Sequence, residues 1–146
     1  MKISQDFREF VEFANSRNLQ FLIVGGYAVA FHGHPRYTKD LDIWIERTPE
    51  NVDKLLAVLD DFGFGSAGLG KSDFLQPNRV IRLGKPPLQI DLLTSISGVE
   101  FPDCYPNRQY LVSDDVRLPF ISIEDLKTNK RASGRHQDLA DLENLE

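Results

Sequence analysis

The sequence predicts a mixed α/β fold in which a twisted, mixed β-sheet is flanked by helices, largely on one side. Some stretches carry apolar residues at helical spacing, while short apolar or alternating runs bounded by Gly and Pro are typical of strands. The chain has 146 residues, of which 41% are hydrophobic, so it can bury the core of one ordinary domain. We therefore expect a single domain over residues 1–146.

Charge and cysteine content exclude several other classes of protein. The net charge of -5 argues against broad, charge-driven binding to a nucleic-acid backbone, although it leaves room for a local basic patch. Cys104 is the single cysteine, so it forms no internal disulfide and offers no zinc-site spacing. No stretch resembles a signal peptide or approaches the ~20 apolar residues of a membrane span. We expect a cytoplasmic protein without membrane contact.

The N-terminal half is predicted to alternate helices and strands. Residues 3–19 and 49–62 carry apolar side chains at helical spacing. Thr48 can cap the second of these helices and Gly63 can end it. Between the two helices we expect a buried strand at 20–26, a short buried helix at 26–33 and an acidic strand at 39–46.

The C-terminal half is predicted to add four strands and two helices. Residues 64–77 read as a glycine-rich loop with room for one helical turn, and residues 97–107 remain ambiguous. Ser122 and Asp125 resemble a capping box at the start of a helix that Gly134 ends. The remaining expected elements are strands at 79–84, 88–94, 109–112 and 116–120, and helices at 122–132 and 135–145.

Three aspartates on two of these strands carry the chemical argument. Side chains alternate along a strand, so Asp40 and Asp42 share one face of theirs, and Asp91 shares a face with Gln89 on a later strand. If the two strands are neighbours, three carboxylates converge, an arrangement that hard divalent cations favour. The alternative readings are a solvated strand face for the pair and an arginine partner for Asp91.

A glycine pair, Gly25–Gly26, follows the buried strand at 20–26. Glycines at a strand–helix turn let a phosphate approach the backbone closely. Two cations held by carboxylates can stabilise the attacking and leaving oxygens of a phosphoryl displacement. Together these motifs indicate phosphoryl chemistry.

The stretches LIVGGYAVAFHGHPRYTKDLDIWI, LQIDLL and DLKTNKRASGRHQDLADLENL together resemble the minimal nucleotidyltransferases of the DNA polymerase β-type superfamily. The similarity extends in particular to members related to aminoglycoside and lincosamide nucleotidyltransferases and to AbiEii-type toxins. The resemblance implies the nucleotidyltransferase fold. It also implies transfer of a nucleoside monophosphate from an NTP to a hydroxyl, with release of pyrophosphate.

The same resemblance implies roles for individual residues. Asp40, Asp42 and Asp91 would bind two Mg²⁺ ions, or Mn²⁺, and Asp91 would also take the proton of the acceptor hydroxyl. Gly25 and Gly26 would contact the triphosphate. The expected basic contacts to the nucleotide are Lys130, preferred over Lys127 on the same helix face, and Arg36 in the loop after Gly33.

For several other residues the sequence predicts a structural role or only a position near the site. His32 and His34 lack a third ligand, so a zinc site is not expected there. Asp138 and Asp141 are expected to pair with nearby basic side chains. Two further candidates are Trp44, which shares the acid-bearing face, and Arg135, a cation at a helix start that the dipole disfavours.

Two functional hypotheses follow. The first is a Mg²⁺-dependent nucleotidyltransferase acting on a small molecule, a tRNA end or a protein hydroxyl; a toxin–antitoxin or defence role is an expectation from resemblance alone. The second is a non-catalytic nucleotide-binding or interaction protein of a toxin–antitoxin pair. Many relatives carry a helical C-terminal domain that helps bind base or acceptor. Acceptor binding is therefore expected to involve a partner protein or a second copy of the chain. The acceptor and the preferred base are not encoded in these motifs.

Overall fold

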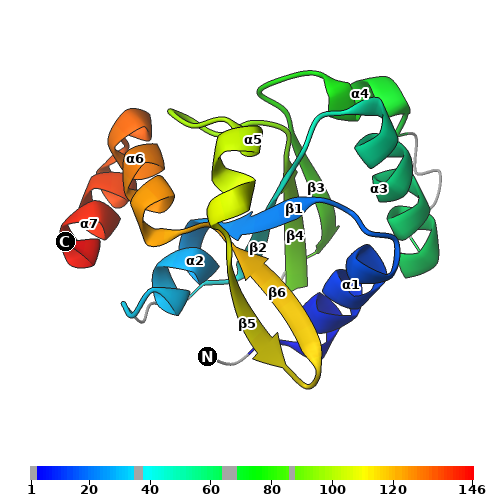
Figure 1. The fold of residues 1–146 in the computed structure, drawn as a ribbon, viewed down its shortest axis with the longest axis horizontal. Helices are drawn as coiled ribbons and strands as arrows, with labels where there is room; N and C mark the ends of the chain where they lie inside the picture. The colour runs from blue at the N-terminus through cyan, green and yellow to red at the C-terminus, as the bar shows by residue number, and fades with distance from the viewer. Residues whose placement is uncertain (1–2, 35–37, 64–68, 86–87) are drawn as a thin grey trace.

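The computed structural model describes residues 3–34, 38–63, 69–85 and 88–146. Within them, helices and strands alternate along the chain much as the sequence predicts (Figure 1). The strands are β1 (Phe21–Val24), β2 (Asp40–Ile45), β3 (Val80–Lys85), β4 (Leu88–Leu93), β5 (Gln109–Ser113) and β6 (Val116–Phe120). The helices are α1 (Gln5–Ser16), α2 (Gly25–Phe31), α3 (Pro49–Phe62), α4 (Lys71–Leu75), α5 (Phe101–Cys104), α6 (Ile123–Ser133) and α7 (His136–Leu145), and a 3₁₀ turn spans Tyr105–Asn107.

The described strands form one six-stranded sheet in the order β3-β4-β2-β1-β6-β5. Two neighbouring pairs, β2 with β4 and β1 with β6, run parallel, and the other pairs run antiparallel. The sheet is therefore mixed, which confirms the predicted fold class. Because β2 lies between β1 and β4, the acidic strand has the glycine turn after β1 on one side and Asp91 on the other.

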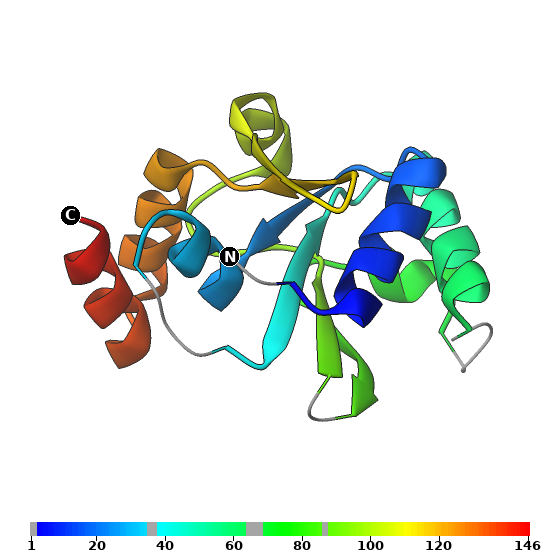
Figure 2. The same ribbon diagram turned by 90° about the horizontal axis from the view of Figure 1, so that it is seen from below.

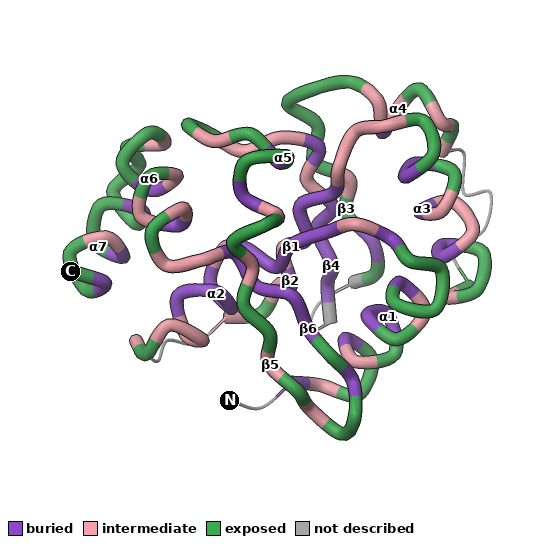
Figure 3. Tube along the Cα trace, viewed as in Figure 1, coloured by how far each residue is buried: buried purple, intermediate pink, exposed green. Residues whose placement is uncertain are grey.

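The core forms where apolar side chains from the central strands meet the N-terminal helices. All four residues of β1 are buried, as are Leu41, Ile43 and Ile45 on one face of β2. Phe10 of α1 packs edge to face on Phe62 of α3, with 5.4 Å between ring centroids. Figure 3 shows the buried positions concentrated in the sheet and on the inner sides of the helices. Removal of this apolar surface from water is the main stabilising contribution.

Helix boundaries follow the local signals in the sequence. The Thr48 hydroxyl accepts a hydrogen bond from the Asn51 N–H at 3.3 Å, and the Ser122 hydroxyl accepts one from the Asp125 N–H at 3.2 Å. Gly63 and Gly134 end α3 and α6 in left-handed conformations that glycine adopts readily. The predicted caps at these positions are thereby confirmed.

One short helix lies where the sequence is ambiguous. Helix α5 packs on the acid-bearing face of β2, where Phe101 meets Trp44 edge to face at 5.1 Å between ring centroids. Figure 2 shows α5 standing apart from α1 and α2, while α6 and α7 lie at the opposite end of the molecule from α3. Helix α5 therefore covers part of the acid-bearing face, where Trp44 would otherwise expose a large apolar surface.

Among the described residues, no helix combines the length and apolar character needed to cross a membrane.

Candidate active site

The two acidic strands are neighbours, and their register sets Asp42 level with Asp91. Strands β2 and β4 are parallel, with Asp42 opposite Asp91 and Asp40 opposite Gln89. Residues opposite each other on adjacent strands share a face, and such strands lie about 4.8 Å apart. The structure thus brings Asp42 and Asp91 side by side. Asp40 lies on the same face, one pleat repeat before Asp42.

Asp42 lies directly over the glycine turn that follows β1. Val24, the last residue of β1, pairs with Asp42, and Gly25 then begins α2 with φ at +68°. A Cβ atom placed on Gly25 would stand 2.9 Å from Cγ of Asp42 and closer still to its carboxylate oxygen. The Asp42 carboxylate therefore occupies the space that any other side chain at position 25 would need. Gly26, in the same turn, is buried.

Asp91 is held in place by polar neighbours on the same face. Its side chain is buried, and its Oδ1 accepts a hydrogen bond from the Gln89 amide at 3.0 Å. Nε of Arg82, across the β3–β4 pair, lies 3.5 Å from the same oxygen. The arginine neighbour considered for Asp91 is thus present. Arg82 is mostly exposed, so this ion pair is open to solvent and weak.

Lys130 belongs to a buried ionic cluster between α6 and α7. Its ammonium lies 2.9 Å from Oδ1 of Asp138 and 3.1 Å from Oδ2 of Asp141, and all three side chains are buried. Asp138 also accepts hydrogen bonds from the Ser133 hydroxyl and from Nε of Arg135. Burial alone would raise the pKa of Asp138, but the hydrogen bonds from Arg135, Ser133 and Lys130 outweigh it and bring the pKa to about 2.

Arg135 connects this cluster to the acidic strand. Its Nε donates to Oδ2 of Asp138 at 2.7 Å, yet four-fifths of the side chain is exposed. The hydrogen bond to Asp138 raises the pKa of Arg135, and the field of Asp42 adds to the effect. A guanidinium held at one edge by Asp138 and near Asp42 can present its remaining N–H groups to an anion.

A cleft of about 390 Å³ joins these features. Gly25 and Asp42 line it from the strand side, and Lys130 and Arg135 line it from the helical side. The segment after β4 closes a third wall, where the Asn129 amide donates to the Ser97 carbonyl at 2.9 Å. The cleft combines a carboxylate, a glycine turn and a cationic wall, which is the chemistry that a metal-bound polyphosphate requires.

The carboxylates are chemically suited to a hard cation, but their arrangement is less convergent than the sequence suggests. Asp42 and Asp91 lie level on adjacent strands, and carboxylate oxygens are the ligands that Mg²⁺ and Mn²⁺ prefer. Among the described residues, however, no group of three acidic, His or Cys side chains is gathered closely enough to hold an ion. In the register of the two strands, Asp40 pairs with Gln89 and not with a third carboxylate.

Some site residues could be anticipated better than others. Arg36 lies outside the described residues. Lys39, at the start of the acidic strand, is exposed. Asp138 and Asp141 pair with a basic side chain, as expected, and that side chain is Lys130 itself. The sequence analysis assigned no role to Gln89. Its position two residues before Asp91 on the same strand face could have indicated the hydrogen bond between them.

Gly25→Ala is expected to destabilise the protein by about 2–3 kcal/mol, because it adds a clash with Asp42 to the cost of a positive φ. Gly134→Ala is the matched control, since Gly134 has φ at +66° and no atom within 4 Å of the place where a Cβ would stand. The control should cost only about 1 kcal/mol. Urea unfolding of both variants measures the difference. Equal losses would mean that the Asp42 carboxylate moves aside without cost.

The fold and the cleft define a nucleotidyltransferase-type domain, and comparison with known proteins agrees. The chain belongs to a family of nucleotidyltransferases of unknown function, DUF6036, whose model matches residues 1–146. No curated protein matches the chain significantly in sequence. The finer resemblance to AbiEii-type toxins and lincosamide nucleotidyltransferases stays a prediction.

Two solved structures show the same fold at low sequence identity. A candidate nucleotidyltransferase from Thermotoga maritima superposes with a TM-score of 0.62 at 12% identity, covering 94% of this chain and 88% of that one. An antigenic nucleotidyltransferase-like protein from Paracoccidioides brasiliensis superposes with a TM-score of 0.54 at 18% identity, covering 98% of this chain and 77% of that one. At these identities the similarity supports the fold alone.

Proposed function

We propose that the protein is a metal-dependent nucleotidyltransferase that moves a nucleoside monophosphate from an NTP to a hydroxyl. The observation that carries the proposal is the position of Asp42, which lies level with Asp91, over the Gly25 turn and across a cleft from Arg135. An acidic pair alone would suit many cation sites. An acidic pair facing a glycine turn and a guanidinium suits a cation that carries a polyphosphate.

In the proposed reaction, the acceptor oxygen attacks the α-phosphorus of the NTP. The bond from that phosphorus to the bridging oxygen of the β-phosphate breaks, and pyrophosphate leaves. Asp91 accepts the proton of the acceptor hydroxyl, while Gln89 and Arg82 hold its carboxylate in position. Gly25 and Gly26 let the triphosphate approach the backbone.

Positive charge in the cleft is assigned to two residues with different roles. Arg135 has N–H groups exposed to the cleft and contacts the phosphates directly. Lys130 is buried with Asp138 and Asp141, so it supports the helical wall and Arg135 rather than acting as a free phosphate ligand. Mg²⁺ or Mn²⁺ bound by Asp42 and Asp91, with Asp40 beside them, would neutralise charge on the phosphates.

Arg135→Gln is expected to weaken binding of an NTP with Mg²⁺ by roughly 10–100-fold, the effect of losing a hydrogen bond between charged groups. Arg131→Gln is the control, because Arg131 pairs with Glu146 at the surface and does not line the cleft. Isothermal titration of both variants gives the comparison. If both bind the nucleotide as the unmodified protein does, Arg135 does not contact the phosphates.

The proposed activity is tested by incubating the protein and Mg²⁺ with each NTP labelled at the α-phosphate and a total extract of RNA, protein and metabolites. Label that becomes attached to one component identifies both the nucleotide and the acceptor class: a small molecule, tRNA or protein. NTP binding without transfer to any component would instead favour the alternative, a non-catalytic nucleotide-binding or interaction protein of a toxin–antitoxin pair. Absence of nucleotide binding would overturn the transferase and the nucleotide-binding protein, and would leave the interaction protein.

A further inference from the structure

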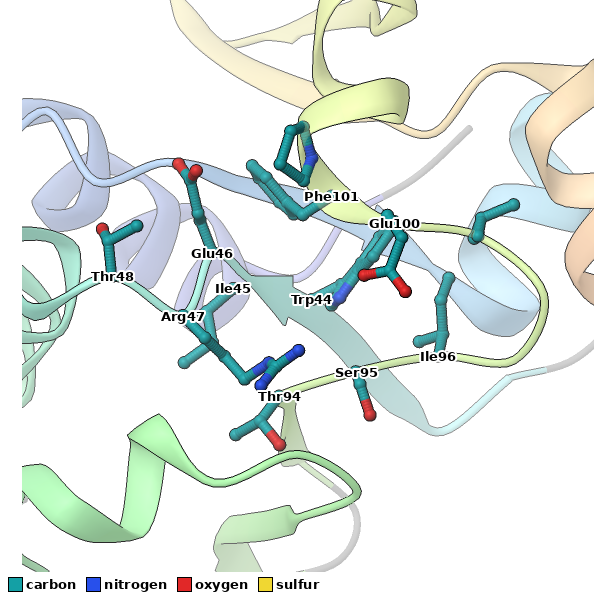
Figure 4. Close-up of a pocket in the computed structure, with 12 residues that line it drawn as sticks. Trp44, Ile45, Glu46, Arg47, Thr48, Thr94, Ser95, Ile96, Glu100 and Phe101 are labelled. Carbon is teal, nitrogen blue, oxygen red and sulfur yellow. The ribbon is translucent and has the colours of Figure 1, made fainter.

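A second cavity, of about 240 Å³, lies beside the candidate active site at the end of β2 (Figure 4). Trp44 and Glu46, at its floor and wall, follow Asp42 on the same face of the chain. Asp42 and Trp44 are two residues apart, which is about 7 Å along a strand. Ser95 and Ile96 line both this cavity and the cleft that contains Asp42. A molecule seated here would therefore extend towards Asp42, which lines the neighbouring cleft.

Trp44 supplies a largely buried hydrogen-bond donor that has no partner among the described residues. The side chain is only 2% exposed, and its indole N–H donates to no residue in the described part of the chain. In the described part of the chain, every fully buried side-chain N or O has a hydrogen-bond partner. Because the indole nitrogen has none, it is not fully buried and reaches the open space of the cavity. In Figure 4 it lies on the side where Glu100 and Ser95 are labelled. Donors in such positions normally have a partner, and the cavity is where that partner would sit.

The charged side chains around Trp44 also form no ion pair with a described residue. Glu46, Arg47 and Glu100 line the cavity, and none of them has an ion pair within the described residues. The hydroxyl groups of Thr94 and Ser95, by contrast, are already bonded to the segment before β3. Two carboxylates against one guanidinium leave the cavity negative. It therefore repels phosphate and attracts a molecule that carries amino groups or hydroxyl donors.

We infer that this cavity is the acceptor subsite and that it takes a small, uncharged or cationic polyol or amino alcohol. The inference rests on the proposed nucleotidyl transfer. The apolar body of the acceptor lies on Trp44 and Phe101, its donor groups bond to Glu46 and Glu100, and one hydroxyl points towards Asp91. That oxygen forms the new bond to the α-phosphorus, its proton passes to Asp91, and pyrophosphate leaves. The phosphates stay in the basic cleft, away from the two glutamates.

Trp44 is the only tryptophan of the chain, so its fluorescence reports on this cavity alone. The probes are glucosamine, glucose and glucuronate, which share one ring and differ in charge. Glucosamine should change the fluorescence most, glucose less and glucuronate least. Glu100→Gln should weaken glucosamine binding about tenfold, the effect of losing a hydrogen bond between two charged groups, and should weaken glucose binding less. Glu12→Gln on α1, exposed and outside the cavity, is the control for the loss of one negative charge.

The measurement separates this inference from the proposed function, because NTP binding is titrated calorimetrically in the same samples. If the NTP binds but none of the three sugars alters the fluorescence, or if glucuronate binds as well as glucosamine, the acceptor subsite is not here. If the NTP itself displaces glucosamine from the cavity, the cavity holds the nucleobase and the inference is also wrong. If the sugars bind in the predicted order but no NTP binds, the cavity stands as a ligand site and the proposed function fails.

Discussion

Asp42→Asn is expected to lower nucleotidyl transfer roughly 10²–10³-fold, the usual cost of removing one group that stabilises charge in the transition state. Asp42 is the residue on which the site depends most, since it faces Asp91, the Gly25 turn and the cationic wall together. Asparagine keeps the shape of the side chain and removes its charge. The loss is measured as incorporation of α-labelled nucleotide into the acceptor fraction.

The same substitution should change the free energy of unfolding by less than about 1 kcal/mol, because relief of repulsion with Asp91 is offset by lost attraction to Arg135. Asp42 and Asp91 lie level on adjacent strands, so removing one charge relieves repulsion between them. Asp53→Asn is the control, because Asp53 is exposed and forms only a surface ion pair with Lys71. Full transfer activity in Asp42→Asn would remove Asp42 from the mechanism.

Where the sequence allowed prediction, the signal was local. Helix α3 begins after Thr48 and ends at Gly63, because a cap and a left-handed glycine act within one turn of chain. The alternation of Asp40, Asp42 and Asp91 likewise fixes which face each side chain occupies. Local patterns do not say which strand lies next to which, so the level register of Asp42 and Asp91 depends on pairing across about 50 residues.

Features that the sequence did not predict depend on contacts between residues far apart in the chain, or lie in an element too short to show a hydrophobic repeat. Helix α5 has one turn, so no hydrophobic repeat marks it, although Phe101 has a clear partner in Trp44. Lys130 carries a recognisable motif position, but its burial between Asp138 and Asp141 arises only when α7 folds back on α6. Lys130 lines the cleft, and its contact with a nucleotide stays a prediction.

That position gives Lys130→Met the largest expected effect on stability. Methionine keeps the length of the side chain and removes its charge, leaving Asp138 and Asp141 buried without their shared ammonium. Breaking a buried ion pair by removing one partner costs about 3–5 kcal/mol, because the remaining charge loses its compensation. Urea unfolding measures the change. Lys127→Met on the same helix is the control and should cost less than about 1 kcal/mol, since its pair with Glu124 is 3.9 Å long and Glu124 is exposed.

A second substitution tests whether the unpaired buried carboxylates cause the loss of stability in Lys130→Met. In Lys130→Met/Asp141→Leu, one of the two buried carboxylates is removed with the ammonium, while Asp138 keeps its hydrogen bonds from Arg135 and Ser133. The double variant should therefore be more stable than Lys130→Met alone by more than about 1 kcal/mol, a coupling that contacting residues show and distant ones do not. If the two losses simply add, the cluster is not held by its charges, and the support assigned to Lys130 behind Arg135 must come from packing instead.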